Sequence, residues 1–72
     1  MDKPFVYMKA SRGDWWNAYR PESAQVFVDI FCKWAATART SEELAHVAYE
    51  ASYLLACGYG KYADKLAPLT RI

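Results

Sequence analysis

The strongest pattern in the chain is a helical repeat of apolar residues over residues 21–38. At about 100° per residue, its large apolar side chains cover an arc of about 200° around the helix. These side chains are Val26, Phe27, Val28, Ile30, Phe31 and Trp34. Pro21 suits the first helical position, and Glu22 is well placed for the positive end of the helix dipole. Since one neighbouring helix covers a narrower stripe, we expect this helix to pack against two elements.

A second amphipathic helix is predicted over residues 40–57. Thr40 and Glu43 have the spacing of a capping box, which marks a helix start, and Gly58 suits its C-terminal end. The apolar positions recur at helical spacing and are Leu44, Val47, Ala48, Ala51, Leu54 and Leu55. The connection to the first helix is only two or three residues long, so we expect an antiparallel hairpin. Alanines at positions 35, 38, 48 and 51 would let the two backbones approach closely.

The residues before the hairpin predict an arm. Residues 4–9 are β-prone and favour an extended arm or a short strand, which pairs across a dimer, joins another protein or lies along the helices. Ser11 and Asp14 have capping-box spacing, with Asp in place of the usual Glu or Gln. This spacing indicates a short helix near residues 12–19, which Pro21 would end.

After the hairpin, residues 61–67 are expected to form one or two helical turns that end before Pro68. The glycines make a bend at residues 58–60 equally acceptable.

Together these elements predict one small all-α domain of 72 residues. Residues 1–20 form an aromatic N-terminal arm, residues 21–57 the helical hairpin, and residues 58–72 a C-terminal turn or short helix. A two-helix hairpin buries too little apolar surface to be stable alone. The wide apolar arc of the first helix would be self-complementary, so we expect a homodimer with two-fold symmetry, such as a four-helix arrangement.

Composition and charge limit the classes of partner that the chain could bind. The chain is 54% hydrophobic and 17% aromatic, which excludes a disordered tail, and its formal net charge is +1. Its basic residues are scattered among acids and form no stripe that would neutralise several phosphates. Residues 40–45 resemble the start of a helix-turn-helix, but residues 46–51 continue as helix without the required turn. A small nucleic-acid-binding regulator that uses Arg12, Arg20, Lys61 and Lys65 is therefore the second hypothesis.

The sequence offers little chemistry, and we expect no enzyme, cofactor or metal. Cys32, His46 and Cys57 lack the spacing of metal-ligand pairs, and a disulfide within the hairpin is geometrically poor. A nucleophile–base pair of Cys32 and His46 would also need an oxyanion hole and a pocket, which a short hairpin rarely offers. The acids Asp29, Glu42, Glu43 and Glu50 are expected on solvated helix faces. With neither a secretory leader nor an apolar run of membrane-spanning length, the sequence favours a soluble cytoplasmic protein.

Aromatic side chains are the best candidates for partner contact, because Tyr and Trp dominate interface energetics. They form three groups: Trp15, Trp16 and Tyr19; His46, Tyr49 and Tyr53 on one helix face; and Tyr59 with Tyr62. Some will instead close the core, as we expect of Trp34. Two adjacent rings cannot both point into one small core, so we expect Trp16 inside and Trp15 outside.

The sequence therefore predicts a non-enzymatic interaction module that binds and modulates, or inhibits, a larger unidentified protein. Chains of this size without catalytic motifs are common among the accessory proteins of phages and other mobile elements.

Overall fold

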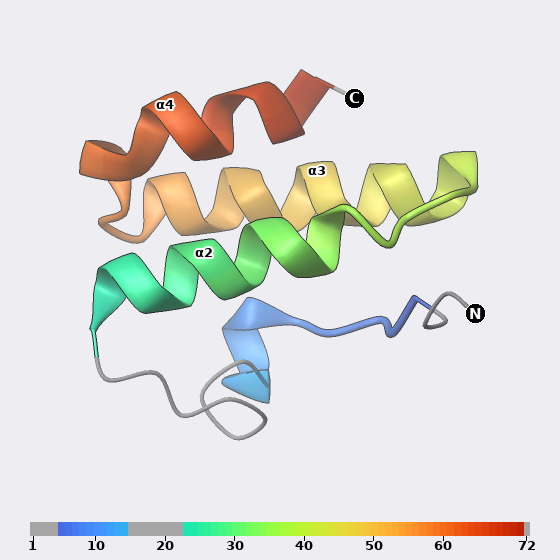
Figure 1. Cartoon of the computed structure of the whole chain (residues 1–72), viewed down its shortest axis with the longest axis horizontal. Helices are drawn as coiled ribbons and strands as arrows, with labels where there is room; N and C mark the ends of the chain where they lie inside the picture. The colour runs from blue at the N-terminus through green and yellow to red at the C-terminus, as the bar shows by residue number, and fades with distance from the viewer. Residues whose placement is uncertain (1–4, 15–22, 72) are drawn as a thin grey trace.

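The computed structural model describes residues 5–14 and 23–71, and these residues are mostly helical, with no strand among them (Figure 1). The α-helices are α2 (Ala24–Ala35), α3 (Ser41–Ala56) and α4 (Ala63–Leu66). Three 3-10 turns accompany them, namely η1 (Ala10–Arg12), η2 (Gly60–Tyr62) and η3 (Ala67–Arg71). The prediction of a small, mainly helical protein is confirmed.

Helix α2 is shorter than the predicted 21–38. Ser23 is its N-cap, and the Ser23 hydroxyl accepts a hydrogen bond from the Val26 amide at 3.3 Å. The helix therefore begins at Ala24, and the predicted start at Pro21 lies outside the described residues. At the other end, the Thr37 hydroxyl donates to the Trp34 carbonyl at 2.7 Å and satisfies a carbonyl of the last turn.

Helix α3 begins as the capping-box pattern predicts. The Glu43 amide donates to the Thr40 hydroxyl at 3.1 Å, and the Glu43 side chain accepts from the Thr40 amide at 3.3 Å. At its C-terminal end, Gly58 has φ 106°, a left-handed conformation that glycine adopts without strain. The Tyr59 amide then donates to the Leu54 carbonyl at 3.2 Å, which completes a Schellman-type cap.

The C-terminal segment is helical for longer than predicted: α4 ends before Pro68, as expected, but the 3-10 turn η3 continues through Pro68 to Arg71. Its turns follow one another from Gly60 to Arg71 and change from α to 3-10 at Ala67. Pro68 has no amide hydrogen, so it interrupts the α-helical hydrogen-bond ladder but tolerates the start of a new turn. Leu66, immediately before this change, is fully buried.

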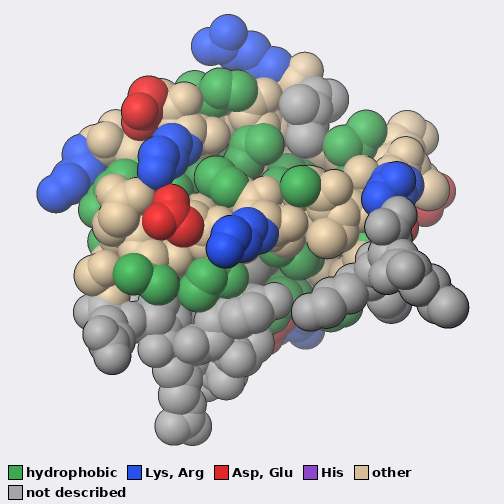
Figure 2. Space-filling view, viewed as in Figure 1, with side chains coloured by type: hydrophobic (Ala, Val, Ile, Leu, Met, Phe, Trp, Pro, Cys, Tyr) green, Lys and Arg blue, Asp and Glu red, His purple; other side chains and the backbone are tan. Residues whose placement is uncertain are grey.

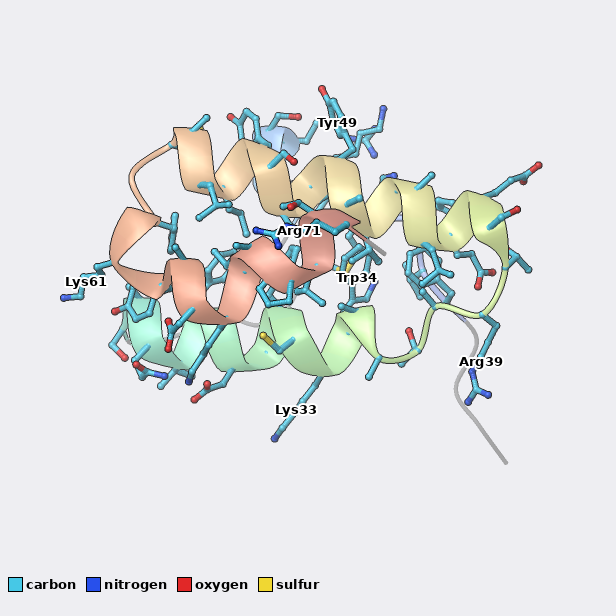
Figure 3. The ribbon with its side chains drawn as sticks, turned by 90° about the horizontal axis from the view of Figure 1, so that it is seen from above. Lys33, Trp34, Arg39, Tyr49, Lys61 and Arg71 are labelled. Atoms are coloured by element: carbon cyan, nitrogen blue, oxygen red, sulfur yellow. The ribbon has the colours of Figure 1, made fainter. Side chains whose placement is uncertain are left out.

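Helices α2 and α3 run in opposite directions, and other parts of the chain cover them on two sides (Figure 1). The C-terminal segment lies over both helices (Figure 3) and approaches α3 most closely at η3. The close backbone approach expected between α2 and α3 is thus made by η3 against α3. The N-terminal arm lies on the opposite side and bonds to both helices.

One core joins these layers. Its members come from the arm, α2, α3 and α4, and are Met8, Phe27, Val28, Phe31, Trp34, Ala35, Val47, Ala51, Leu54 and Leu66. Helix α2 thus buries its wide apolar arc against the arm, α3 and α4 within one chain, although Val26 stays exposed. The width of this arc is therefore no longer a reason to require a second subunit.

Candidate interaction surface

Three side chains of the helices hold the backbone of the N-terminal arm. The Trp34 indole N–H donates to the Val6 carbonyl at 2.8 Å, and His46 Nε2 bonds to the Met8 carbonyl at 2.7 Å. The Ala10 amide donates to Glu50 Oε1, also at 2.7 Å. A carbonyl can only accept, so His46 carries a proton on Nε2. The arm is thus docked through its main chain.

The spacing of these bonds explains why an extended arm fits a helix. His46 and Glu50 are one turn apart on the same face of α3, which separates them by about 6 Å along the helix axis. Their partners, the Met8 carbonyl and the Ala10 amide, flank Lys9 and point to the same edge of the extended chain. Two side chains on one face of α3 can therefore bond to one edge of the arm, and Trp34 of α2 continues the series at Val6. Side chains of the helices therefore replace a neighbouring strand.

A short turn fixes the end of the arm. The Lys9 carbonyl accepts from the amides of Arg12 and Asp14 at 3.1 and 3.4 Å, and the Lys9 amide donates to Asp14 Oδ2 at 2.9 Å. Gly13, at φ 72°, allows the chain to turn. The Asp14 carboxylate thus accepts a hydrogen bond from the Lys9 amide instead of forming a capping box with Ser11. The rest of the predicted helix at residues 12–19 lies outside the described residues.

Glu50 is the one buried charged residue in the described part of the chain, with 1% of its surface exposed. Its Oε1 accepts the Ala10 amide, whereas its Oε2 has no hydrogen-bond partner. The expectation of a solvated helix face is therefore wrong for Glu50, although Asp29 and Glu42 are exposed. The arm covers Glu50, and this burial could not be seen from the helical pattern of α3 alone.

Aromatic rings collect where the arm meets the helices. The Phe5 ring lies 4.9 Å from Trp34 and 5.0 Å from Tyr7, centroid to centroid, and the Tyr7 ring lies 5.2 Å from His46. Trp34 is buried, as expected for a ring that closes the core, and Phe5 is partly buried against that core. His46 is therefore both a hydrogen-bond partner of the arm and a member of this ring cluster.

The outer side of this junction carries exposed apolar groups. Val6 is 57% exposed, Tyr7 52% and Tyr49 66%, and they are three of the four large apolar side chains exposed in the described residues. Tyr49 projects from the side of α3 that faces away from α2 (Figure 3), one turn from His46. The fourth, Val26, lies about 12 Å from Trp34 along α2. We call Val6, Tyr7, His46 and Tyr49 the arm–α3 surface.

The other predicted contact residues differ in their surroundings. Tyr53 is half-buried, and a hydrogen bond with the Cys57 side chain raises its pKa. Tyr59 packs 5.4 Å from the Phe27 ring and 6.2 Å from the Tyr62 ring, and burial raises the pKa of Tyr59. Tyr59 and Tyr62 thus pack against the core at the far end of α3.

Trp15, Trp16 and Tyr19 lie outside the described residues, so their roles and orientations stay predictions. Sequence reasoning missed Val6 and Tyr7, although both lie in the segment predicted to be extended.

The basic residues do not gather into a phosphate-binding surface where the structure describes them. Arg12 pairs with Asp14 at 3.5 Å, Lys65 pairs with Asp29 at 3.1 Å, and Lys61 Nζ lies 5.6 Å from the centre of the Tyr62 ring. Acidic and basic side chains are interspersed on the face that Figure 2 shows. Arg20 is outside the described residues. These pairings do not favour the nucleic-acid hypothesis.

Chemical groups elsewhere in the described residues are sparse. Cys32 is a half-buried free thiol and Cys57 an exposed one, and burial raises the pKa of Cys32. Within residues 5–14 and 23–71, no three His, Cys, Asp or Glu residues are arranged to hold a metal ion, and none of the helices has the length and apolarity to span a membrane. Comparison with known proteins found no family model, no curated protein and no solved structure that matches this chain.

Proposed function

We propose that this protein is a non-enzymatic interaction module that binds and modulates a larger protein through the arm–α3 surface. The observation that carries the proposal is three exposed apolar side chains on the arm and on α3, Val6, Tyr7 and Tyr49, with the Tyr7 ring 5.2 Å from His46. Tyrosines suit such a surface because the ring gains from burial while the hydroxyl keeps a polar contact. Inhibition of a host protein by a phage or mobile-element accessory protein is one form of this function.

The way the arm is held supports a surface that is ordered before binding. Its backbone is fixed at Val6, Met8 and Ala10, so the partner does not have to order the arm. Ordering flexible side chains and loops is a large part of the free-energy cost of association. Trp15, Trp16 and Tyr19 extend the candidate surface on sequence grounds.

We also propose that the module self-associates as a homodimer and acts in the cytoplasm. The two free thiols suit a reducing compartment. Self-association is compatible with partner binding if the two processes use different groups of the arm.

The function can be tested by comparing what matched variants bind. Tyr7→Ser with Tyr49→Ser removes two exposed rings, whereas Val26→Ser removes an exposed apolar side chain of α2 away from the arm. Circular dichroism should show all three proteins folded, and affinity capture followed by mass spectrometry should recover the partner with wild type and Val26→Ser only. Equal recovery by the double variant would contradict binding through this surface.

A further inference from the structure

The arm has a second edge that the helices do not use. In an extended chain, the amide and carbonyl of one residue point to the same edge, and those of the next residue point to the opposite edge. The bonded groups of Val6, Met8 and Ala10 face the helices, so those of Phe5, Tyr7 and Lys9 face away. The turn at Asp14 already uses the Lys9 amide and carbonyl. The Phe5 and Tyr7 main-chain groups make no hydrogen bond within the described chain.

We propose that this outer edge, the backbone of Phe5–Tyr7, pairs with the same segment of a second copy to form an antiparallel two-stranded ribbon. The inference rests on the self-association in the proposed function and assigns the residues that make it. An extended chain with unpaired amides and carbonyls is a template for another extended chain. A second copy supplies a segment that is already held in the required conformation.

One register fits the available groups best. When Val6 lies opposite Val6 of the second copy, Phe5 faces Tyr7 and Tyr7 faces Phe5. Each of these two pairs exchanges two hydrogen bonds, which makes four in all. Centring the ribbon on Tyr7 would pair Phe5 with Lys9, whose groups are occupied, and would leave two bonds. The Lys9 turn therefore both selects the register and ends the ribbon.

The side chains agree with this register. The Val6 pair occupies a position without hydrogen bonds, where opposed Cα atoms are about 4.5 Å apart and side chains meet most closely. Val6, 57% exposed in one chain, would be covered by its counterpart. Phe5 opposite Tyr7 is an aromatic cross-strand pair. Residues 5–8 carry no charge, and the formal net charge of +1 gives little repulsion between copies.

The ribbon and the arm–α3 surface share only Val6, which the second copy would cover. Pairing otherwise consumes main-chain amides and carbonyls in the plane of the ribbon, whereas the Tyr7 ring lies 5.2 Å from His46 and Tyr49 is on α3. In a dimer joined in this way, the two-stranded ribbon would connect the arm–α3 surface of one copy to that of the other.

A cysteine placed at the centre of the ribbon tests the register. The variant carries Val6→Cys with Cys32→Ala and Cys57→Ser, so residue 6 has the only thiol, and Tyr7→Cys in the same background is the control of similar exposure. Under diamide, we expect Val6→Cys to form a covalent dimer at least about tenfold faster than Tyr7→Cys, since only residue 6 meets its own copy at disulfide distance. Equal rates would overturn the ribbon.

Opposite charges at the same position give an independent test. Val6→Lys and Val6→Glu should each sediment as monomers while keeping wild-type circular dichroism, and their equimolar mixture should recover the dimer. If wild type dimerises but neither charge affects it, the ribbon is wrong and self-association stands. If wild type stays monomeric up to about 1 mM, a concentration at which even weak association would be seen, then both the ribbon and self-association are wrong.

Discussion

Replacing Glu50 with glutamine separates the charge of this side chain from its shape. The glutamine side chain would keep an oxygen for the Ala10 amide, which now donates to Glu50 Oε1 at 2.7 Å. A hydrogen bond to a charged group contributes about 1.5–3 kcal/mol and a neutral one about 0.5–1.5 kcal/mol, so the weaker bond costs about 1 kcal/mol. The new amide NH2 would occupy the place of Oε2, which has no partner, at a cost of about 1–3 kcal/mol.

Removal of the Glu50 charge should increase the stability of the folded protein, which opposes these two losses. A buried charge carries an effective desolvation penalty of several kcal/mol, and Glu50 is 1% exposed with only one oxygen bonded. The penalty offsets both losses, so we expect Glu50→Gln to be as stable as wild type or up to about 2 kcal/mol more stable. For a chain of this size, each kcal/mol of added stability raises Tm by about 4–8 °C, so a gain of about 2 kcal/mol would be readily measured.

Glu50→Ala is the companion variant, because it also removes the acceptor and the Cγ methylene group. The lost packing costs about 0.8 kcal/mol per methylene, so this variant should be about 1–3 kcal/mol less stable than Glu50→Gln. Urea denaturation followed by circular dichroism measures both differences, and amide exchange at Ala10 should accelerate in Glu50→Ala only. A loss of more than about 1 kcal/mol in Glu50→Gln would refute the reasoning, since it would mean that Oε2 has a partner worth that much.

Three further predictions concern the fold and the thiols. Leu66→Ala should destabilise the protein by about 2–5 kcal/mol in urea denaturation, because Leu66 is fully buried; a cost below about 1 kcal/mol would mean that α4 is not part of the core. Thr40→Ala should lower stability by about 1 kcal/mol by removing the cap of α3, measured in the same way, whereas Thr40→Ser should restore it. Iodoacetamide at pH 8 should modify Cys57 faster than Cys32, since Cys57 is exposed while burial shields Cys32 and raises its pKa; peptide mass spectrometry reads both rates, and equal rates would contradict the burial of Cys32.

The parts of the fold that follow from local chemistry could be predicted. The capping box of Thr40 and Glu43 involves residues three apart, so its sequence signature was sufficient to locate the start of α3. Ser23 is also a readable N-cap signal for α2, but Pro21 is an equally acceptable helix start, so the two local signals compete. At Pro68, a local rule predicts a stop, whereas burial of Leu66 and packing of η3 on α3 favour a further turn.

The candidate surface was predictable only in part. Helical angles alone indicated that Tyr49 lies off the aliphatic stripe of α3, and it is exposed. The position of the arm depends on contacts across tens of residues, such as Ala10 with Glu50, which periodicity does not encode. The same contacts bury Glu50, because a residue on the polar side of α3 is solvated only until another segment covers it.

The docking of the arm separates the groups that hold it from the groups that it displays. The helices bind main-chain atoms of Val6, Met8 and Ala10, and every residue except proline offers an amide and a carbonyl of this kind. The exposed side chains of Val6 and Tyr7 make none of these hydrogen bonds and can be changed with all three bonds retained. His46 differs, because its ring both bonds to Met8 and contacts Tyr7. Loss of binding in Val6 or Tyr7 variants would therefore report on the surface, whereas loss in His46 variants would combine docking with contact.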